Sequence, residues 1–285
     1  GYFFSGLNTS PCVIPLCHPY VSGEKAMKEI SSKENPIIKE IARLKHKKYR
    51  DQAGMYILEG PHLVEEALHS RQEPVYLLVH RKRLEQYRDI IDGYPDQSWY
   101  IVDERIMKQL SDTESPQGML GVMAKPAYRL EQVARPGGLL VVLDQLSDPG
   151  NVGTIIRTAW AFAVDAVLLT TGCVDPFNPK VVRGAMGGTL HVPVIDGITM
   201  AQLNGLKSRG YRFYGTAAKG ARSVYEVDFK GSLAVVIGSE ARGLSPEVAG
   251  LCDEMVKIPC KDGVDSLNAA VACGIILSKS WSDRY

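Results

Sequence analysis

The sequence lacks several features that mark common classes of protein. No apolar run approaches the roughly 20 residues that a membrane-spanning helix needs, and the first residues lack the charged start and long apolar centre of a signal peptide. Its six cysteines form no C-x-x-C pair and no metal-like spacing. We therefore expect no membrane association, no metal site, and reduced thiols in a cytoplasmic protein.

Two glycine-rich signatures of phosphate binding are also missing. Neither G-x-G-x-x-G nor G-x-x-x-x-G-K-[ST] occurs, which disfavours a nicotinamide-dependent enzyme. The glycines in the loops after the strands therefore do not belong to either common phosphate-binding motif. A basic excess is absent too, because 33 Lys and Arg residues face 32 Asp and Glu residues and the formal net charge is +1. Any nucleic-acid binding must therefore come from local patches.

What the sequence does contain is enough apolar material for two domains. Its 285 residues are 45% hydrophobic, so a full core can be buried. Residues 1–33 show no periodicity, and we interpret them as an extension that is foreign to the natural protein or poorly ordered. An organelle-targeting peptide is the competing interpretation, which the absence of arginine from residues 1–25 disfavours.

The remainder divides at a short segment rich in Pro and Gly. Residues 34–127 alternate helical and strand patterns and predict a small α/β domain. Residues 128–138 contain Pro136, Gly137 and Gly138 and predict a linker. Residues 139–285 alternate apolar strands and helices more regularly, which predicts a mostly parallel sheet covered on both faces.

Two polar loops in the last fifty residues follow buried strands. The apolar run 233–237 stops at Gly238, and Ser239 and Glu240 follow. A second loop ends with Ser266 and Asn268 before a long apolar helix. Because ligands of open α/β sheets bind at the carboxyl ends of the strands, we expect the active site there.

A third loop, in residues 143–162, opens a helix. Pro149 and Gly150 predict a turn, and Asn151 is well placed to cap the helix. The apolar residues of this helix share one face, and Arg157 projects from nearly the opposite face. Arg157 is therefore available to a partner, although a solvated surface residue is the plainer interpretation.

One basic run could bind phosphate. Arg43, Lys45, Lys47 and Lys48 occur with no acid among them, as in an RNA-binding patch. A solvated helix face is an equally good interpretation.

Three motifs carry a resemblance to a known family. The sequences DPGNVGTIIRTA, IGSEARGL and IPCKDGVDSLNAAVACGI resemble the three motifs of the SpoU (TrmH-like) branch of the SPOUT RNA 2'-O-ribose methyltransferases. YILEGPHLVEEAL and TESPQGMLGVMAKP resemble the ribosomal-protein-like substrate-binding domain that precedes the catalytic domain in some members. The resemblance implies S-adenosylmethionine as cofactor, a C-terminal trefoil knot and a homodimer.

The resemblance also implies roles for individual residues. Asn151 and Arg157 fall on the functional positions of the first motif, with Glu240 as a partner that fixes the arginine. The implied cofactor-binding residues are Thr216, Gly238, Ile258 and Leu267. Ser266 and Asn268 would contact the cofactor tail or the target nucleotide, with a helix cap as the alternative for Ser266, and Lys180 and Arg183 would contact RNA phosphates.

The substrate implied is large-subunit ribosomal RNA, with a guanosine favoured. That choice follows from the amino-terminal domain, which several transfer-RNA enzymes of the family lack. A transfer-RNA 2'-O-methyltransferase and a catalytically silent RNA-binding or assembly factor on the same fold remain the alternatives.

Overall fold

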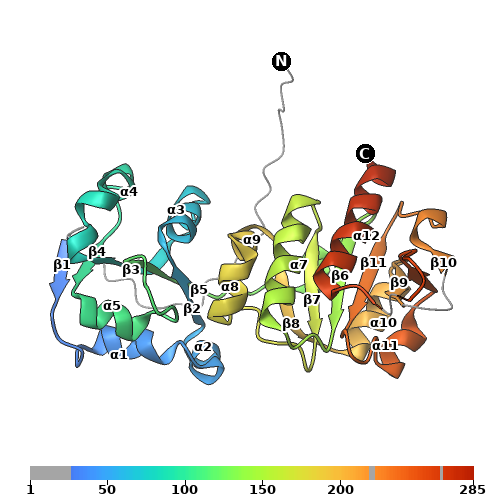
Figure 1. The fold of residues 1–285 in the computed structure, drawn as a ribbon, viewed down its shortest axis with the longest axis horizontal. Helices are drawn as coiled ribbons and strands as arrows, with labels where there is room; N and C mark the ends of the chain where they lie inside the picture. The colour runs from blue at the N-terminus through green and yellow to red at the C-terminus, as the bar shows by residue number, and fades with distance from the viewer. Residues whose placement is uncertain (1–26, 218–221, 264–265) are drawn as a thin grey trace, which may run out of the picture.

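Two α/β domains lie side by side in the protein (Figure 1). The computed structural model describes residues 27–217, 222–263 and 266–285. Most of the expected extension, residues 1–26, lies outside the described residues.

The first domain is built on a mixed sheet of five strands in the order β1-β4-β3-β5-β2. Strands β1, β4 and β3 run parallel, and β5 is antiparallel to both β3 and β2. Helix α3 packs on one face, and α1 and α5 pack on the other. Its elements are β1 (Met27–Ile30), α1 (Pro36–Arg43), α2 (Lys47–Ala53), β2 (Met55–Glu59), α3 (Pro61–His69), β3 (Pro74–His80), the 3-10 turns η1 (Arg81–Arg83) and η2 (Glu85–Tyr87), α4 (Arg88–Gly93), β4 (Trp99–Val102), α5 (Glu104–Leu110) and β5 (Met119–Ala124).

This domain begins earlier than the sequence indicated. Strand β1 pairs with β4, so that Met27 lies opposite Trp99 and Ile30 opposite Val102. The predicted extension over residues 1–33 is therefore wrong at its carboxyl end. Only Ile30 of β1 is buried, and a four-residue edge strand with one buried side chain leaves no periodic signal.

The predicted linker is packed against the second domain. Residues 128–138 include a short helix, α6 (Leu130–Val133). Leu130, Val133 and Ala134 are buried in the second domain's core. The segment is therefore part of the second domain and not a flexible linker.

The described strands of the second domain all pair in parallel, in agreement with the mostly parallel sheet that the alternation of elements predicted. Its strand order is β10-β12-β9-β11-β6-β7-β8 within the described residues. Its elements are β6 (Leu139–Asp144), α7 (Pro149–Ala161), β7 (Ala166–Thr170), α8 (Pro179–Ala185), α9 (Gly188–His191), β8 (Val194–Ile198), α10 (Met200–Ser208), β9 (Arg212–Thr216), β10 (Arg222–Ser223), η3 (Val224–Glu226), β11 (Leu233–Gly238), α11 (Pro246–Leu251), β12 (Glu254–Lys257) and α12 (Ala269–Arg284).

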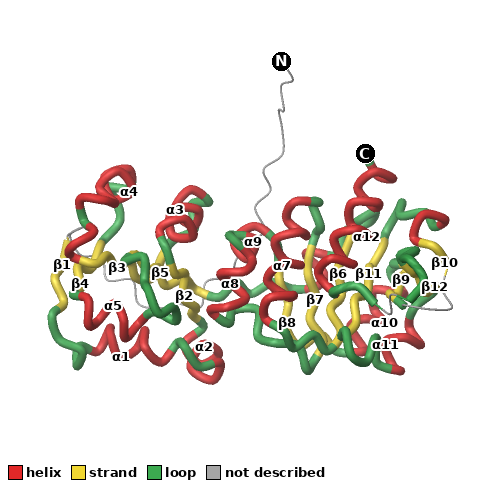
Figure 2. The backbone as a smooth tube through the Cα atoms, viewed as in Figure 1, coloured by secondary structure: helices red, strands yellow, loops and turns green. Residues whose placement is uncertain are grey.

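Both faces of this sheet are covered (Figure 2). Strand β6 shows why its sequence is uniformly apolar: Leu139, Val141 and Leu143 point into one core, and Leu140 and Val142 into the other. Helices α7 and α12 close the first core, and α6, α10 and α11 close the second.

A continuous apolar core joins the two domains. Phe177, Val182 and Leu190 of the second domain belong to the cluster formed mainly by α3 and the first sheet. The Phe177 ring lies 4.8 Å from that of Tyr56 in β2. Helices α8 and α9 therefore form the junction, as their central position in Figure 1 shows.

The α/β class and the parallel sheet are thus confirmed, whereas the trefoil knot stays a prediction. Among the described residues no helix is long and apolar enough to cross a membrane.

Candidate active site

The carboxyl ends of β9, β11 and β12 meet at one edge of the second sheet. These strands are neighbours in the order β12-β9-β11. Thr216 ends β9 beside Val256 of β12, and Gly238 ends β11 opposite Asp144 of β6. Ile258 directly follows β12. Three of the predicted cofactor-binding residues, Thr216, Gly238 and Ile258, are therefore brought together.

The loop after β11 is folded back tightly on Gly238. The Ser239 amide donates to the Gly243 carbonyl (3.1 Å), and the Gly243 amide donates to the Ser239 carbonyl (2.8 Å). A Cβ on Gly238 would lie 2.3 Å from the Gly243 carbonyl carbon and 2.6 Å from the Leu244 nitrogen. The backbone of the following loop therefore leaves room only for glycine at position 238.

A buried carboxylate that the sequence did not single out anchors the far end of this loop. Asp144 is 2% exposed and accepts hydrogen bonds from the Ser245 amide (2.6 Å) and the Thr170 hydroxyl (3.0 Å). Its signal in the sequence was an acidic residue ending an otherwise apolar strand. Because both bonds hold polar groups at the sheet edge, Asp144 shapes the loop between Gly238 and Ser245.

Helix α7 is capped by a different residue from the one predicted. Asp148 is the N-cap, and its carboxylate accepts from the Asn151 amide (2.7 Å), while Pro149 occupies the first turn. The assignment of the cap to Asn151 is wrong, because an Asp three residues earlier takes that position. The Asn151 side chain is consequently free to bond elsewhere.

A shared hydrogen-bond network connects the three motifs. Asn151 donates to Glu240 (3.0 Å), and Asn268 donates to both the Asn151 side-chain oxygen (2.8 Å) and Glu240 (2.8 Å). The Ala269 amide donates to the same Glu240 oxygen (3.1 Å). One carboxylate therefore holds the start of α7, the loop after β11 and the start of α12 in fixed relation.

Asn268 also caps α12. Its side-chain oxygen accepts from the Ala270 amide (3.0 Å) and the Val271 amide (3.2 Å). The alternative interpretation of Ser266 as the cap is therefore wrong, and Ser266 is exposed before the helix.

Arg157 lies on the outer side of α7. Ile155, Ile156 and Ala159 are fully buried beneath the helix, whereas Arg157 is exposed. Within the described residues its guanidinium makes no hydrogen bond or ion pair. The expected contact with Glu240 is not formed; the Glu240 Oε1 accepts instead from the Asn151 and Asn268 side chains.

The apolar residues predicted to hold the cofactor flank the same edge. Ile258 is half-buried and packs on the core beneath the sheet. Leu267, in the loop before α12, is half-buried too. Partly exposed apolar side chains beside free backbone groups can cover a purine and read its edge, so these residues fit a nucleoside-containing cofactor.

The basic run near α2 does not form one open patch. Lys45 donates to the Ser111 carbonyl (2.6 Å), and Lys47 pairs with Asp196 of the second domain (3.2 Å). Arg43 lies over the Tyr49 ring, with its guanidinium carbon 5.6 Å from the centroid. Lys45 and Lys47 are therefore already engaged by the protein.

The end of the same run is buried at the junction. Arg50 is 2% exposed and donates twice to Asp175, at 2.8 and 2.5 Å. Its remaining nitrogen donates to the Leu44 and Lys45 carbonyls. The arginine is fully paired, so its role is to join the two domains.

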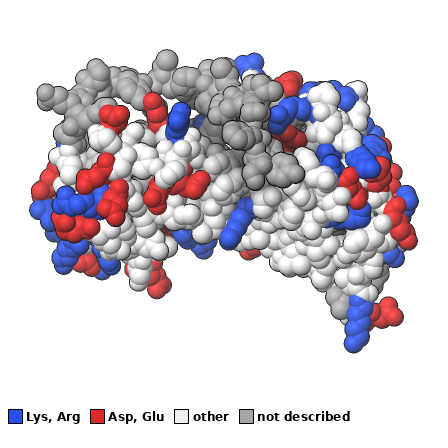
Figure 3. Space-filling view, turned by 90° about the horizontal axis from the view of Figure 1, so that it is seen from above, with Lys and Arg blue, Asp and Glu red and all other residues white. Residues whose placement is uncertain are grey.

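Arg183 is likewise engaged at the junction. It pairs with Asp112 (2.9 Å) and approaches Glu59 (3.5 Å), both in the first domain. Arg183 therefore shares its donors with acids of the first domain, whereas Lys180 is exposed, and contact of either residue with RNA phosphates stays a prediction. Basic and acidic side chains are interspersed on the face seen in Figure 3.

Two thiols of the second domain, Cys252 and Cys273, have raised pKa values. Burial raises the pKa of the Cys252 thiol to about 11 and that of Cys273 to about 12, so both stay protonated near neutrality. The described part of the chain contains no cluster of three or more His, Cys, Asp or Glu side chains that could hold a metal.

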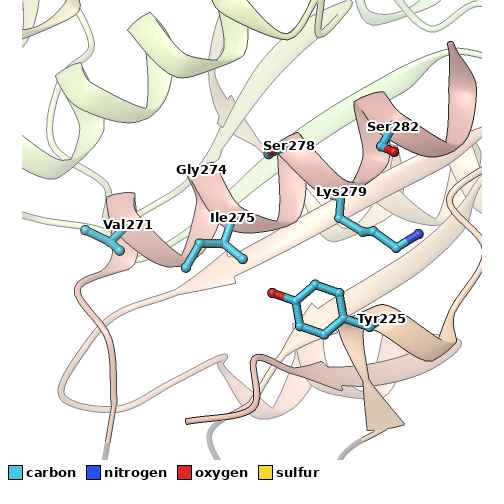
Figure 4. A pocket seen from close by; sticks show the side chains of 7 residues that line it. All are labelled: Tyr225, Val271, Gly274, Ile275, Ser278, Lys279 and Ser282. Carbon is cyan, nitrogen blue, oxygen red and sulfur yellow. The ribbon is translucent and has the colours of Figure 1, made fainter.

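A shallow groove runs along the outer face of α12, next to the network (Figure 4). Tyr225 faces the helix across it, and Tyr225 and Val271 are more than half exposed. The groove is lined by Tyr225, Val271, Gly274, Ile275, Ser278, Lys279 and Ser282.

Family comparisons match both domains. Residues 138–278 match the SpoU rRNA Methylase family, and residues 35–121 match the MRM3-like substrate binding domain. A relative from Bacillus subtilis (strain 168), the 23S rRNA (guanosine(2553)-2'-O)-methyltransferase RlmP, is 33% identical over 251 residues that cover 88% of this chain and 98% of that one. The human mitochondrial rRNA methyltransferase 3 is 29% identical, over 82% of this chain and 69% of that one.

Solved structures agree over both domains. The AdoMet-bound rRNA methyltransferase from Sinorhizobium meliloti is 29% identical with a TM-score of 0.78, covering 89% of this chain and 97% of that chain. The methyltransferase AviRb from Streptomyces viridochromogenes, in complex with AdoMet, is 25% identical with a TM-score of 0.79, covering 87% and 97%.

Proposed function

Because the chain belongs to the SpoU family of S-adenosylmethionine-dependent RNA 2'-O-ribose methyltransferases, we propose that its substrate is large-subunit ribosomal RNA and that the methylated nucleotide is a guanosine. The observation that carries the catalytic part is the network of Asn151, Glu240 and Asn268, which holds the three motifs at one sheet edge. The Bacillus subtilis relative, named for a 23S rRNA guanosine, supports the substrate.

The cofactor would be held by Thr216, Gly238, Ile258 and Leu267. S-adenosylmethionine supplies an electrophilic methyl group on a sulfonium. The half-buried Ile258 and Leu267 offer apolar contact for its adenine, and the loop held by Gly238 and Asp144 offers backbone groups. Ser266, exposed beside Leu267, is available for the cofactor tail or the target nucleotide.

Arg157 would act on the ribose. Methyl transfer forms a bond from the 2'-oxygen to the methyl carbon and breaks the carbon–sulfur bond, whose electron pair stays on sulfur to give a neutral thioether. The hydroxyl proton passes to solvent water. A guanidinium holds its proton at neutral pH and is therefore a poor base. We therefore assign Arg157 the task of orienting the 2'-hydroxyl and an adjoining phosphate, for which its unpaired donors suit it.

Glu240 and Asn151 have supporting roles in this scheme. Both side chains bond to Asn268 and to each other, so they position the start of α7, from which Arg157 projects two turns later. Their effect on catalysis would be exerted through that helix.

RNA contacts outside the catalytic edge would come from the exposed cations. Arg43, Lys48 and Lys180 are exposed, whereas Lys45, Lys47 and Arg183 are held by protein partners. The first three are therefore the candidates for phosphate binding.

A homodimer is the proposed assembly. The outer face of α12 carries the exposed Val271 and Trp281, and Tyr225 and Tyr285 flank it with 59% and 81% exposure. Exposed aromatic and apolar side chains gathered on one helix and beside it are typical of an interface. Sedimentation equilibrium tests this, since a Val271→Glu variant should be a monomer.

A cytoplasmic site of action also stays our proposal. The bacterial relative named for 23S rRNA supports it, and the mitochondrial relative gives the alternative. Imaging of a carboxyl-terminally tagged protein in its own cells decides between the two.

The substrate is tested by mapping 2'-O-methyl groups in RNA from cells with and without the protein. We expect one mark to be lost from large-subunit ribosomal RNA. A mark lost from transfer RNA alone would establish the transfer-RNA alternative. Calorimetric titration with S-adenosylmethionine addresses the silent RNA-binding factor, which would show no cofactor binding.

A further inference from the structure

Trp160 is an exposed aromatic side chain on the helix that carries Arg157. It lies in α7 and is 40% exposed. Its ring is stacked on that of His191 in α9, with centroids 4.2 Å apart and planes at 5°. Because His191 covers one face of the indole, the exposed area belongs to the other face and the edges.

The His191 ring is itself fixed by the first domain. Its Nε2 lies 2.6 Å from a carboxylate oxygen of Glu66 in α3 and 3.4 Å from the Ser70 hydroxyl. Helix α9 lies between α7 and α3 (Figure 1). The orientation of Trp160 therefore depends on both domains, and the ring is rigid before any ligand arrives.

Two glycines, Gly187 and Gly188, lie next to α7 near Trp160. A Cβ on Gly187 would lie 3.8 Å from the Trp160 ring and 3.2 Å from the Glu66 side chain. A Cβ on Gly188 would lie 3.2 Å from the Cα of Arg157. Gly188 thus lets the start of α9 lie directly on the backbone of α7, and Gly187 places no side chain against the Trp160 ring.

Arg157 and Trp160 are close to one another by helix geometry. Residues three apart on an α-helix lie on the same side, about one turn apart. Arg157 is exposed and makes no bond within the described residues, and Met186, 39% exposed, lies next to Gly187 in the chain. The surface thus combines a free guanidinium, an open indole face and a flexible apolar side chain.

We propose that Trp160, supported by His191, is a stacking platform for an RNA base that neighbours the target ribose. This inference rests on the proposed function, because it takes RNA to be the substrate and Arg157 to contact the target nucleotide. Unpaired RNA bases are recognised by stacking on aromatic side chains. A base on the indole would hold its backbone beside Arg157, so Trp160 is a positioning residue that separates the target nucleotide from its neighbours.

The main experiment compares Trp160→Ala with Trp160→Phe in methyl transfer to ribosomal RNA. Loss of one base–aromatic stack is worth about 1–3 kcal/mol, which corresponds to a rise in KM for RNA of roughly 5- to 150-fold. Trp160→Phe retains an aromatic face and should stay within about threefold of the wild type. His191→Ala, which removes only the support, should give an intermediate KM.

Two further measurements separate this role from a structural one. The affinity for S-adenosylmethionine should be unchanged in all three variants, because the cofactor residues lie at the other end of α7. RNA should quench the tryptophan fluorescence of the wild type, and Trp160→Phe should remove most of that quenching, since Trp99 is 2% exposed and Trp281 lies on α12.

The outcomes are distinguishable. A wild-type protein that transfers methyl groups to RNA, with a Trp160→Ala variant of equal KM and equal quenching, would overturn the platform alone. A Trp160→Ala variant that changes oligomeric state with no change in KM would also overturn it, in favour of a contact between copies. Absence of transfer by the wild type would overturn the proposed function itself.

Discussion

Arg157 and Arg50 show how the same side chain serves opposite purposes in two regions of this molecule. Arg50 is buried at the domain junction, where Asp175 and two carbonyl groups accept its hydrogen bonds. Arg157 lies exposed on the outer side of α7, with no partner among the described residues. A guanidinium whose donors are all used holds structure together, and one whose donors are free can bind a ligand.

The polar networks around these two arginines differ in the same way. The junction network is buried, since Arg50 and Asp175 are 2% and 6% exposed, and the Phe177 and Tyr56 rings pack together at the same junction. The network of Asn151, Glu240 and Asn268 is exposed, so water and substrate reach it. We expect the first to determine folding stability and the second to determine activity.

The largest effect should follow from Arg157→Ala. Removing a group that orients the reacting hydroxyl should lower the single-turnover rate by roughly 10²- to 10⁴-fold, while the affinity for S-adenosylmethionine stays within about twofold. Quenched-flow transfer and calorimetry measure the two quantities. A near-normal single-turnover rate would show that the free arginine is not the catalytic one.

The next largest effect should come from Gly238→Ala. The added methyl group would clash with the backbone of Gly243 and Leu244, so the loop must move and cofactor affinity should fall at least tenfold. Gly205→Ala in α10 is the matched control, because no heavy atom lies within 4 Å of its added Cβ. Equal cofactor affinity in the two variants would contradict the assignment of this loop.

Breaking the buried pair should cost stability. Asp175→Ala leaves the Arg50 charge buried and unpaired, which typically destabilises a protein by about 3–5 kcal/mol. The double variant Arg50→Met with Asp175→Leu should recover most of that loss. Urea unfolding measures both, and a single variant as stable as the wild type would contradict the closed network.

The smallest expected effects come from Lys48 and Lys47, two neighbouring lysines of which only Lys47 is ion-paired within the described part of the chain. Lys48 is exposed without an ion pair among the described residues, so Lys48→Ala should reduce the salt dependence of RNA binding by about one ion. Lys47 pairs with Asp196 and Asp51, and Lys47→Ala should change stability by less than about 1 kcal/mol. If Lys48→Ala and Lys47→Ala changed the salt dependence of RNA binding by the same amount, the proposed difference between the two lysines would be contradicted.

The sequence predicted helices and strands better than it predicted which side chains bond to one another. Arg157 was correctly placed opposite the buried Ile155 and Ile156 because that inference needs only helical spacing. The burial of Arg50 was not predictable, since its partner Asp175 lies 125 residues away. A run of cations has the same composition whether it faces water or another domain.

Local competition explains the remaining errors. Asp148 and Asn151 are both suitable N-cap residues, and only the backbone geometry decides between them. Similarly, Glu240 could have paired with Arg157 or with the amides of Asn151 and Asn268. The structure selects the amides because the start of α12 also presents the Ala269 amide to the same oxygen.

The most direct test of the account is the chemical identity of the product. Large-subunit ribosomal RNA lacking the modification is incubated with the protein and methyl-labelled S-adenosylmethionine, then digested to nucleosides and separated. We predict label in a 2'-O-methylnucleoside, chiefly 2'-O-methylguanosine, and none with Arg157→Ala. Label in a base-methylated nucleoside, or equal label with Arg157→Ala, would contradict the assignment of this edge as a ribose 2'-O-methyltransferase site.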